Sequence, residues 1–150
     1  MAKYFYEDLT LGRRFDCGSH VMTRDEIIAF ATEFDAQPFH IDEDAAKASF
    51  FRGLVASGWH TASVTMRAVA EGLLLKSESM GAPGIDELKW LRPVRADDEL
   101  SVTCEVIDRR ESKSRPERGS VRFRISVTNQ RGETVMTQEN WIMFGRRPSA

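Results

Sequence analysis

The sequence predicts an α+β protein in which a curved antiparallel sheet of about five or six strands covers one long central helix. Two observations lead to this prediction. The first is a mostly apolar segment with helical periodicity at residues 59–75, and the second is a succession of alternating segments after it. A helix that is apolar on most faces, yet too short and too polar to cross a membrane, needs a covering layer. Strands with one apolar face can supply that layer.

Composition narrows the class of protein. A chain of 150 residues with a net charge of -2 favours one domain, at residues 1–150, with no general attraction to nucleic acid or anionic membranes. No apolar run approaches the ~20 residues that span a bilayer, and the first residues lack an apolar signal region. Cys17 and Cys104 have no metal-ligand spacing. We therefore expect a cytoplasmic protein with two buried free thiols.

The N-terminal third predicts a covering segment, a strand and two helices. Residues 4–13 mix aromatic and apolar side chains and end in a turn, and residues 14–22 alternate as a strand. Thr23 and Glu26 form a capping box ahead of a helix that ends near Phe34, because the loop containing Pro38 cannot continue it. Residues 42–48 predict a short helix with acidic residues in its first turn.

The central helix and the sheet follow. Apolar residues recur at alternating spacings of three and four along residues 59–75, which is one helical face. The strand candidates that follow occupy residues 85–92, 100–107, 120–129 and 133–144. The third is the most regular, and a short hairpin at residues 130–132 joins it to the fourth.

The candidate chemistry lies just before the central helix. Asp35 and His40 are five residues apart with Pro38 between them, and Gly58 follows downstream. A carboxylate and an imidazole held by one loop can serve as an acid/base pair. If Asp35 is desolvated under the helix, its pKa is expected to rise. The alternative for each residue taken alone is structural, a turn or cap for Asp35 and a satisfied buried side chain for His40.

The start of the central helix is a candidate oxyanion site. The backbone N–H groups near Ser57, Gly58 and Trp59 have no intrahelical acceptor and lie at the positive end of the helix dipole. Gly58 would also allow a ligand to approach the backbone closely. The alternative, in which Ser57 is only the N-cap and Gly58 only a turn glycine, is compatible with this role.

Residues 35–42 resemble the hydratase motif of the MaoC-like dehydratase family, which includes the (R)-specific enoyl-CoA hydratases. The family motif has Asp, then Asn-Pro, then His, and an acid shortly after. Its matches here are Asp35, Pro38, His40 and Asp42. Gln37 replaces the asparagine, and Phe34 replaces the glycine usual before the aspartate. The resemblance continues through residues 8–12 and 53–58 and covers almost the whole chain.

This resemblance implies a hotdog fold and a hydro-lyase that reversibly hydrates a trans-2-enoyl thioester to a 3-hydroxyacyl thioester, as in fatty acid metabolism. It implies Asp35 and His40 as the catalytic pair, with Gln37, Pro38 and Asp42 supporting their loop. The thioester of coenzyme A or of an acyl carrier would be the substrate, with no cofactor and no metal. The family also implies a homodimer or a dimer-based oligomer, without nucleic acid or membrane partners.

Two other functions stay open. A thioesterase on the same fold usually has a carboxylate on the central helix, where the only candidate is Glu71, late in the helix. A catalytically silent thioester-binding subunit is the other. The basic stretch 109–118 is either a solvated hairpin or a contact for the phosphates of coenzyme A. Phe39, Phe51 and Trp90 either line an acyl pocket or belong to the core.

Overall fold

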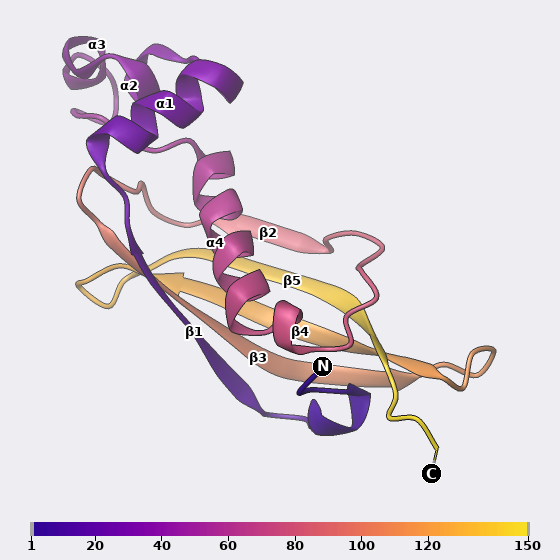
Figure 1. Ribbon diagram of the computed structural model, residues 1–150. Coiled ribbons are helices and arrows are strands. Elements are labelled where there is room, and N and C mark those ends of the chain that lie inside the picture. Colours follow the sequence, from indigo (N-terminus) through magenta and orange to yellow (C-terminus); the bar gives the residue numbers. More distant parts are fainter. Residues whose placement is uncertain (1, 150) are drawn as a thin grey trace.

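The computed structural model describes residues 2–149, and its main feature is a long helix lying across a five-stranded antiparallel sheet. The helix is α4 (Gly58–Gly72), and three shorter helices gather near its first turn at one end of the sheet (Figure 1). This arrangement confirms the predicted α+β class with a central helix. Among the described residues, no helix is long and apolar enough to cross a membrane.

The sheet contains every predicted strand. Its members are β1 (Arg14–Val21), β2 (Glu87–Trp90), β3 (Glu99–Glu111), β4 (Arg118–Thr128) and β5 (Thr134–Gly145). They pair in the order β1-β3-β4-β5-β2, so β1 and β2 form the two edges. The strands β3, β4 and β5 are long and pair over most of their length, and their alternating burial directs one face toward α4.

The small helices precede α4 in the chain. They are α1 (Arg24–Phe34), α2 (Pro38–Ile41) and α3 (Glu43–Lys47). The predicted capping box is present at the start of α1, where the Thr23 hydroxyl accepts from the N–H of Glu26 and the Glu26 carboxylate accepts from that of Thr23. Asp42 caps α3 by accepting from the N–H groups of Asp44 and Ala45, which confirms the predicted start of that helix.

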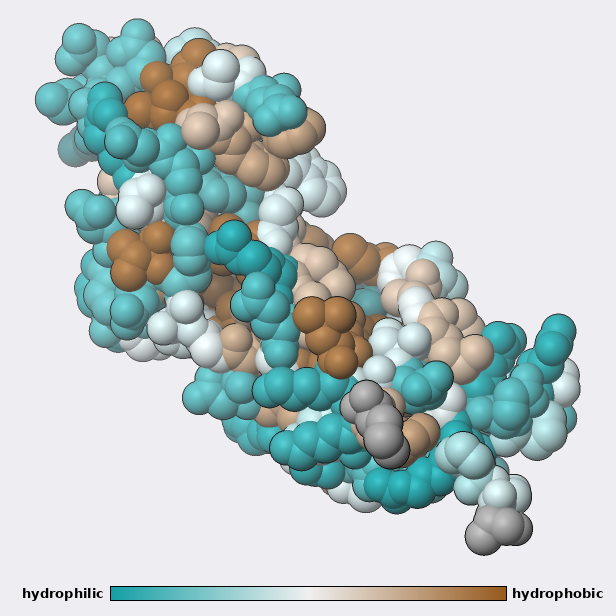
Figure 2. Space-filling view, in the orientation of Figure 1, coloured by the Kyte–Doolittle hydropathy of each residue, from teal (hydrophilic) through white to brown (hydrophobic). Residues whose placement is uncertain are grey.

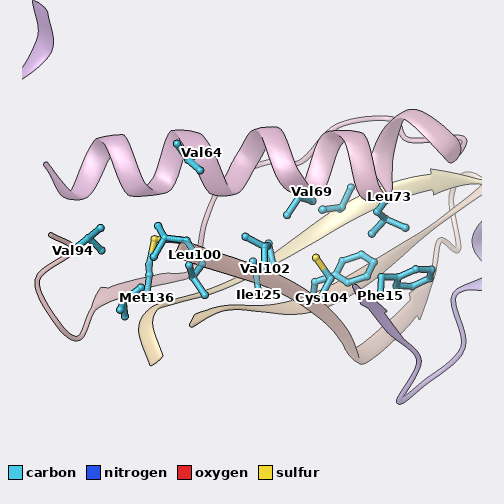
Figure 3. Packing of buried hydrophobic residues seen from close by; sticks show 14 of the residues in the cluster. Phe15, Val64, Val69, Leu73, Val94, Leu100, Val102, Cys104, Ile125 and Met136 are labelled. Atoms are coloured by element: carbon cyan, nitrogen blue, oxygen red, sulfur yellow. The ribbon is translucent and has the colours of Figure 1, made fainter. Parts of the chain in front are cut away.

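The core lies between α4 and the concave face of the sheet. Val69 and Leu73 point from the helix toward Val102 and Ile125 on the strands (Figure 3). Burial of such side chains contributes roughly 1.5–3 kcal/mol each relative to exposure. The hydrophobic contact between these two layers therefore fixes the position of the first turn of α4.

Three expectations need correction. His40 lies in the helical turn α2 rather than in a loop, because four residues are too few to show helical periodicity in the sequence. The helix α4 ends at Gly72, and residues 74–76 continue as a short 3-10 helix. Of the two thiols, Cys104 is buried but Cys17 is only partly so, although the two sulfur atoms are 3.7 Å apart.

The sheet also leaves one face of α4 uncovered in the single chain. Trp59 and Met66 on this face are 59% and 50% exposed. Figure 2 shows hydrophobic residues at the surface on the side that carries α4. The expectation that the chain itself covers the helix is therefore correct for the sheet side only.

Candidate active site

The two candidate acid/base residues meet beside the first turn of α4. Asp35 is the C-cap residue of α1 and His40 lies in α2, so the short connection between these helices carries both. The Nε2 atom of His40 is 3.3 Å from Oδ2 of Asp35. Both side chains are mostly shielded from solvent, with 7% of the His40 side chain and 19% of the Asp35 side chain exposed. The predicted pairing of Asp35 with His40 is thus present in the structure.

His40 is oriented by a backbone carbonyl. Its Nδ1 atom lies 2.6 Å from the carbonyl oxygen of Val55, which can only accept a hydrogen bond. Nδ1 therefore carries a proton, and Nε2 is the nitrogen that remains available to exchange one with Asp35 or with a ligand. Nothing in the sequence pattern indicates Val55, because the contact joins backbone and side chain across fifteen residues.

Asp35 is held at both oxygens. The amide of Gln37 donates to Oδ1 at 2.7 Å, and the hydroxyl of Ser57 donates to Oδ2 at 2.7 Å. Burial by itself raises the pKa of Asp35, but these two hydrogen bonds and the nearby His40 outweigh it and hold the pKa below the usual value. The expected rise in this pKa is therefore wrong, because the desolvated carboxylate receives two donors that favour its ionised form.

The start of α4 has free backbone donors. The N–H of Trp59 donates to the Ser57 hydroxyl at 3.3 Å, so Ser57 is the N-cap. Among the described residues, the N–H of Gly58 has no hydrogen-bond acceptor. The Ser57 N–H also has no acceptor within residues 2–149, but Ser57 is not part of the cavity wall described below, whereas Gly58 is. Of the three predicted oxyanion residues, Gly58 therefore offers the available N–H at the cavity, while the N–H of Trp59 is already engaged.

Gly58 is also required by a neighbouring side chain. A Cβ atom added at Gly58 would lie 2.4 Å from Cε2 of Trp90, so the indole ring occupies the space that any larger residue would need. Trp90 packs edge to face on Trp59, with ring centroids 5.1 Å apart. The sequence suggests close approach of a ligand as the reason for this glycine, and the structure adds close approach of Trp90.

A cavity of about 540 Å³ opens in front of the pair. Asp35, His40 and Gly58 all line it, and its other walls are largely apolar and aromatic. Those walls include Phe39, Phe50, Phe51, Trp59, Trp90, Leu91 and Val94. Volume and lining are typical of a small-molecule site with a few convergent polar groups. Phe39, Phe51 and Trp90 thus line the pocket, while Phe50 and Leu91 are wall residues that the sequence analysis does not identify.

The family model for the MaoC-like domain matches residues 9–130 of this sequence. The chain belongs to the MaoC-like family. Its hotdog architecture agrees with that membership, since the crystal structure of a MaoC-like dehydratase from Rhodospirillum rubrum superimposes with a TM-score of 0.90. That protein is 47% identical, and the match covers 97% of this chain and 99% of the other.

Hydratases are among the relatives of this MaoC-like chain. The R-hydratase PhaJ1 from Pseudomonas aeruginosa is 26% identical with a TM-score of 0.76, over 95% of this chain and 86% of that one. The (R)-specific enoyl-CoA hydratase of Rhodospirillum rubrum is 24% identical over 149 residues, which is 96% of this chain and 94% of the relative. The proteins similar to this chain therefore include both a dehydratase and hydratases by name.

The motif positions of this MaoC-like chain have distinct structural roles. Gln37, which stands where the family usually has asparagine, reaches the Asp35 carboxylate directly. Pro38 occupies the first turn of α2, where its missing N–H is not needed. Asp42 caps α3 with its carboxylate. Gln37 and Pro38 therefore support the segment that carries Asp35 and His40, and Asp42 stabilises the helix that follows.

Ser57→Ala tests the joint role of this serine as helix cap and as donor to Asp35. We expect the free energy of unfolding to fall by about 1–2 kcal/mol, because the N-cap hydrogen bond of α4 and a buried bond to a charged group are both lost. Urea unfolding followed by circular dichroism measures this change. Ser63→Ala is the matched control, since its hydroxyl only donates to the Trp59 carbonyl on the exposed side of the same helix. Equal effects of the two substitutions would contradict the assignment.

Proposed function

We propose that this protein is a hydro-lyase that reversibly adds water to a trans-2-enoyl thioester and forms a 3-hydroxyacyl thioester. The observation that carries the proposal is the convergence of three groups on one cavity. These are the Asp35 carboxylate, Nε2 of His40 and the free N–H of Gly58. Hydration of an enoyl thioester needs a proton acceptor for water, a proton donor for the alpha carbon and a donor to the thioester oxygen. The three groups can supply these functions.

In the first step, the pair activates water. The two hydrogen bonds to Asp35 keep its carboxylate ionised at neutral pH. In the proposed starting state His40 carries a proton on Nε2 as well as on Nδ1, and the Nε2 proton lies between the imidazolium ring and the Asp35 carboxylate. A water molecule bound against both groups gives one proton to Asp35 as its oxygen forms a bond to the beta carbon. The carbon–carbon double bond shifts its electron pair toward the thioester, which becomes an enolate.

In the second step, the enolate is stabilised and protonated. The N–H of Gly58, at the positive end of the α4 dipole, donates to the developing oxyanion. The proton on Nε2 of His40 passes to the alpha carbon and completes the product. Transfer of the proton from Asp35 to Nε2, across a contact of 3.3 Å, then restores the starting state. Dehydration follows the same steps in reverse.

The proposal includes coenzyme A or a carrier protein as the thiol portion of the substrate and a homodimer as the assembly. Large apolar side chains near the β2 edge are exposed in the single chain, which favours a partner surface there. They include Trp59, Met66, Ile85, Trp90 and Leu91. The basic β3–β4 hairpin projects from the end of the sheet opposite to α1–α3 (Figure 1). Within one chain, this hairpin is therefore remote from the catalytic cavity.

Two assays run in parallel test the proposal. With crotonyl-CoA as substrate, we expect loss of the enoyl absorbance without release of free thiol. A thioesterase would release thiol, and a silent binding subunit would change neither signal. Glu71 does not support the thioesterase alternative, because it is exposed at the far end of α4, next to the final residue Gly72. Thiol release without hydration would overturn the proposal.

A further inference from the structure

A second cavity lies beside α4, beyond the catalytic one. It has a volume of about 290 Å³ and is enclosed by the second half of α4, the 79–85 segment and the strands β4 and β5. The two cavities follow each other along the same elements. On α4, Trp59 lines the first and Met66 the second, and on β5, Val135 lines the first and Gln138 the second. They therefore lie one after the other between helix and sheet, although no residue lines both.

Two amide side chains face this second cavity. Gln138 and Asn140 are only 9% and 4% exposed, and they occupy inward positions of β5 between Met136 and Ile142. The Gln138 amide nitrogen donates to the Asn140 amide oxygen at 3.1 Å. Within residues 2–149, the remaining Gln138 oxygen and Asn140 nitrogen have no hydrogen-bond partner. One acceptor and one donor thus remain available in a site that is otherwise mostly apolar.

Neither of these two amide atoms is sealed in the core, since the buried side-chain atoms without a partner within residues 2–149 belong to His60 and Arg109. Both atoms are therefore accessible to water or to a bound group. The inward positions of a strand facing a core are otherwise filled by apolar residues, as Met136 and Ile142 are here. A bound group that both donates and accepts a hydrogen bond would satisfy the two amides together. A hydroxyl group has this property, and a carbonyl oxygen would satisfy the donor alone.

The charge of the lining restricts the ligand further. None of the side chains that line the second cavity is ionisable. They are Met66, Val69, Leu74, Ser79, Ala82, Ile85, Ile125, Gln138, Asn140 and Ile142, together with Gly81 and Gly84. A carboxylate placed there would lose its hydration without gaining a counter-charge, which is strongly unfavourable. The cavity is therefore suited to a neutral polar group at the end of an apolar chain.

We propose that the acyl chain of the substrate runs along α4 from the catalytic pair into this second cavity, where Gln138 and Asn140 select a tail bearing a neutral oxygen, such as a terminal hydroxyl. The identity of the ligand as an acyl thioester rests on the proposed function. From Gly58 to Met66 the helix rises about 12 Å, at ~1.5 Å per residue, which suits a medium-length chain.

The boundary between the two cavities is the tryptophan pair. Trp90 on β2 is opposite Met136 on β5, and Leu88 is opposite Gln138. Trp90 therefore comes before the amide pair in the direction from the first cavity to the second. The ring of Trp90 is backed by Gly58 and Trp59. Trp90 and Trp59 are 45% and 59% exposed in the single chain, so a path beside them does not cross the core, and in the proposed homodimer the partner subunit would cover that path.

The kinetic test compares three trans-2-decenoyl-CoA substrates that differ only at the terminal carbon, which is a methyl, a hydroxymethyl or a carboxylate. We expect kcat/KM for the hydroxylated substrate to exceed the other two at least tenfold. Gln138→Met and Asn140→Leu, both close in volume to the native residues, should each reduce or reverse this preference by raising kcat/KM for the methyl-ended substrate. Thr137→Val, directly before Gln138 and on the opposite face of β5, is the control and should retain it.

A binding test separates this inference from the proposed function. Calorimetric titration with saturated decanoyl-CoA and its terminally hydroxylated analogue requires no turnover, and we expect the hydroxylated ligand to bind the wild-type protein at least tenfold more tightly. Equal binding, or tighter binding of the methyl-ended ligand, would overturn the inference even if crotonyl-CoA is hydrated. A binding preference without any hydration would instead support the cavity assignment and contradict the proposed reaction. A change of oligomeric state in the Asn140→Leu protein would also overturn the cavity assignment, because the amides would then stabilise the oligomer.

Discussion

Asp35→Asn is expected to lower kcat/KM for the hydration of crotonyl-CoA by about 10²–10⁴-fold while the fold is retained. The amide keeps the size of the side chain and an oxygen acceptor, but it cannot accept the proton that water must lose. Steady-state kinetics from the enoyl absorbance measures the change, and circular dichroism checks the fold. Asp25→Asn is the matched control, because that carboxylate is 91% exposed on α1 and, among the described residues, pairs with Arg24 alone.

The opposite outcome for Asp35 has a clear meaning. If Asp35→Asn turns over crotonyl-CoA at the wild-type rate, the carboxylate acts only as a hydrogen-bond acceptor for Gln37 and Ser57. The lowered pKa of Asp35 would then reflect structural stabilisation of its charge rather than preparation for proton transfer.

His40→Asn and His40→Gln are expected to reduce the same activity by about 10²–10⁴-fold. Together the two variants distinguish the role of Nδ1 from that of Nε2. The Asn amide can still donate to the Val55 carbonyl in place of Nδ1. The Gln amide reaches farther and places a donor near Oδ2 of Asp35, in place of Nε2. Neither amide can take up and release a proton, so we expect both variants to be impaired.

The pattern of losses decides the role of His40. Retention of activity in His40→Asn would show that the anchor to Val55 is sufficient and that Nε2 does not transfer a proton. His20→Asn is the control for replacing a histidine with a polar residue, because His20 lies on β1, where it contacts Glu26 at 2.7 Å and neither Asp35 nor His40. Its activity should remain within about twofold of the wild type.

Local sequence patterns predict most of this fold. The capping box at Thr23 and Glu26 marks the start of α1, and regular alternation marks β4. Both signals depend on neighbours within a few residues, and the structure preserves them. The end of α4 at Gly72 is less predictable, because the apolar pattern continues through Leu73, Leu74 and Leu75 while the backbone changes to a 3-10 turn.

The site is predictable in part. The pairing of Asp35 with His40 follows from the motif, but the groups that set their properties come from distant parts of the chain. Val55 orients His40 through a backbone carbonyl, and Trp90 reaches Gly58 from the edge strand β2. Neither contact leaves a periodic or compositional signal. The inward amides of β5 do leave one, since Gln138 and Asn140 fall on the apolar phase of an alternating strand.

The crystal structure of the Asp35→Asn protein bound to crotonyl-CoA tests the central geometry most directly. In the proposed mechanism, the thioester oxygen lies within hydrogen-bond distance of the Gly58 N–H, and the beta carbon faces the gap between residue 35 and Nε2 of His40. A thioester bound outside this cavity, or one whose oxygen points away from the first turn of α4, would contradict it.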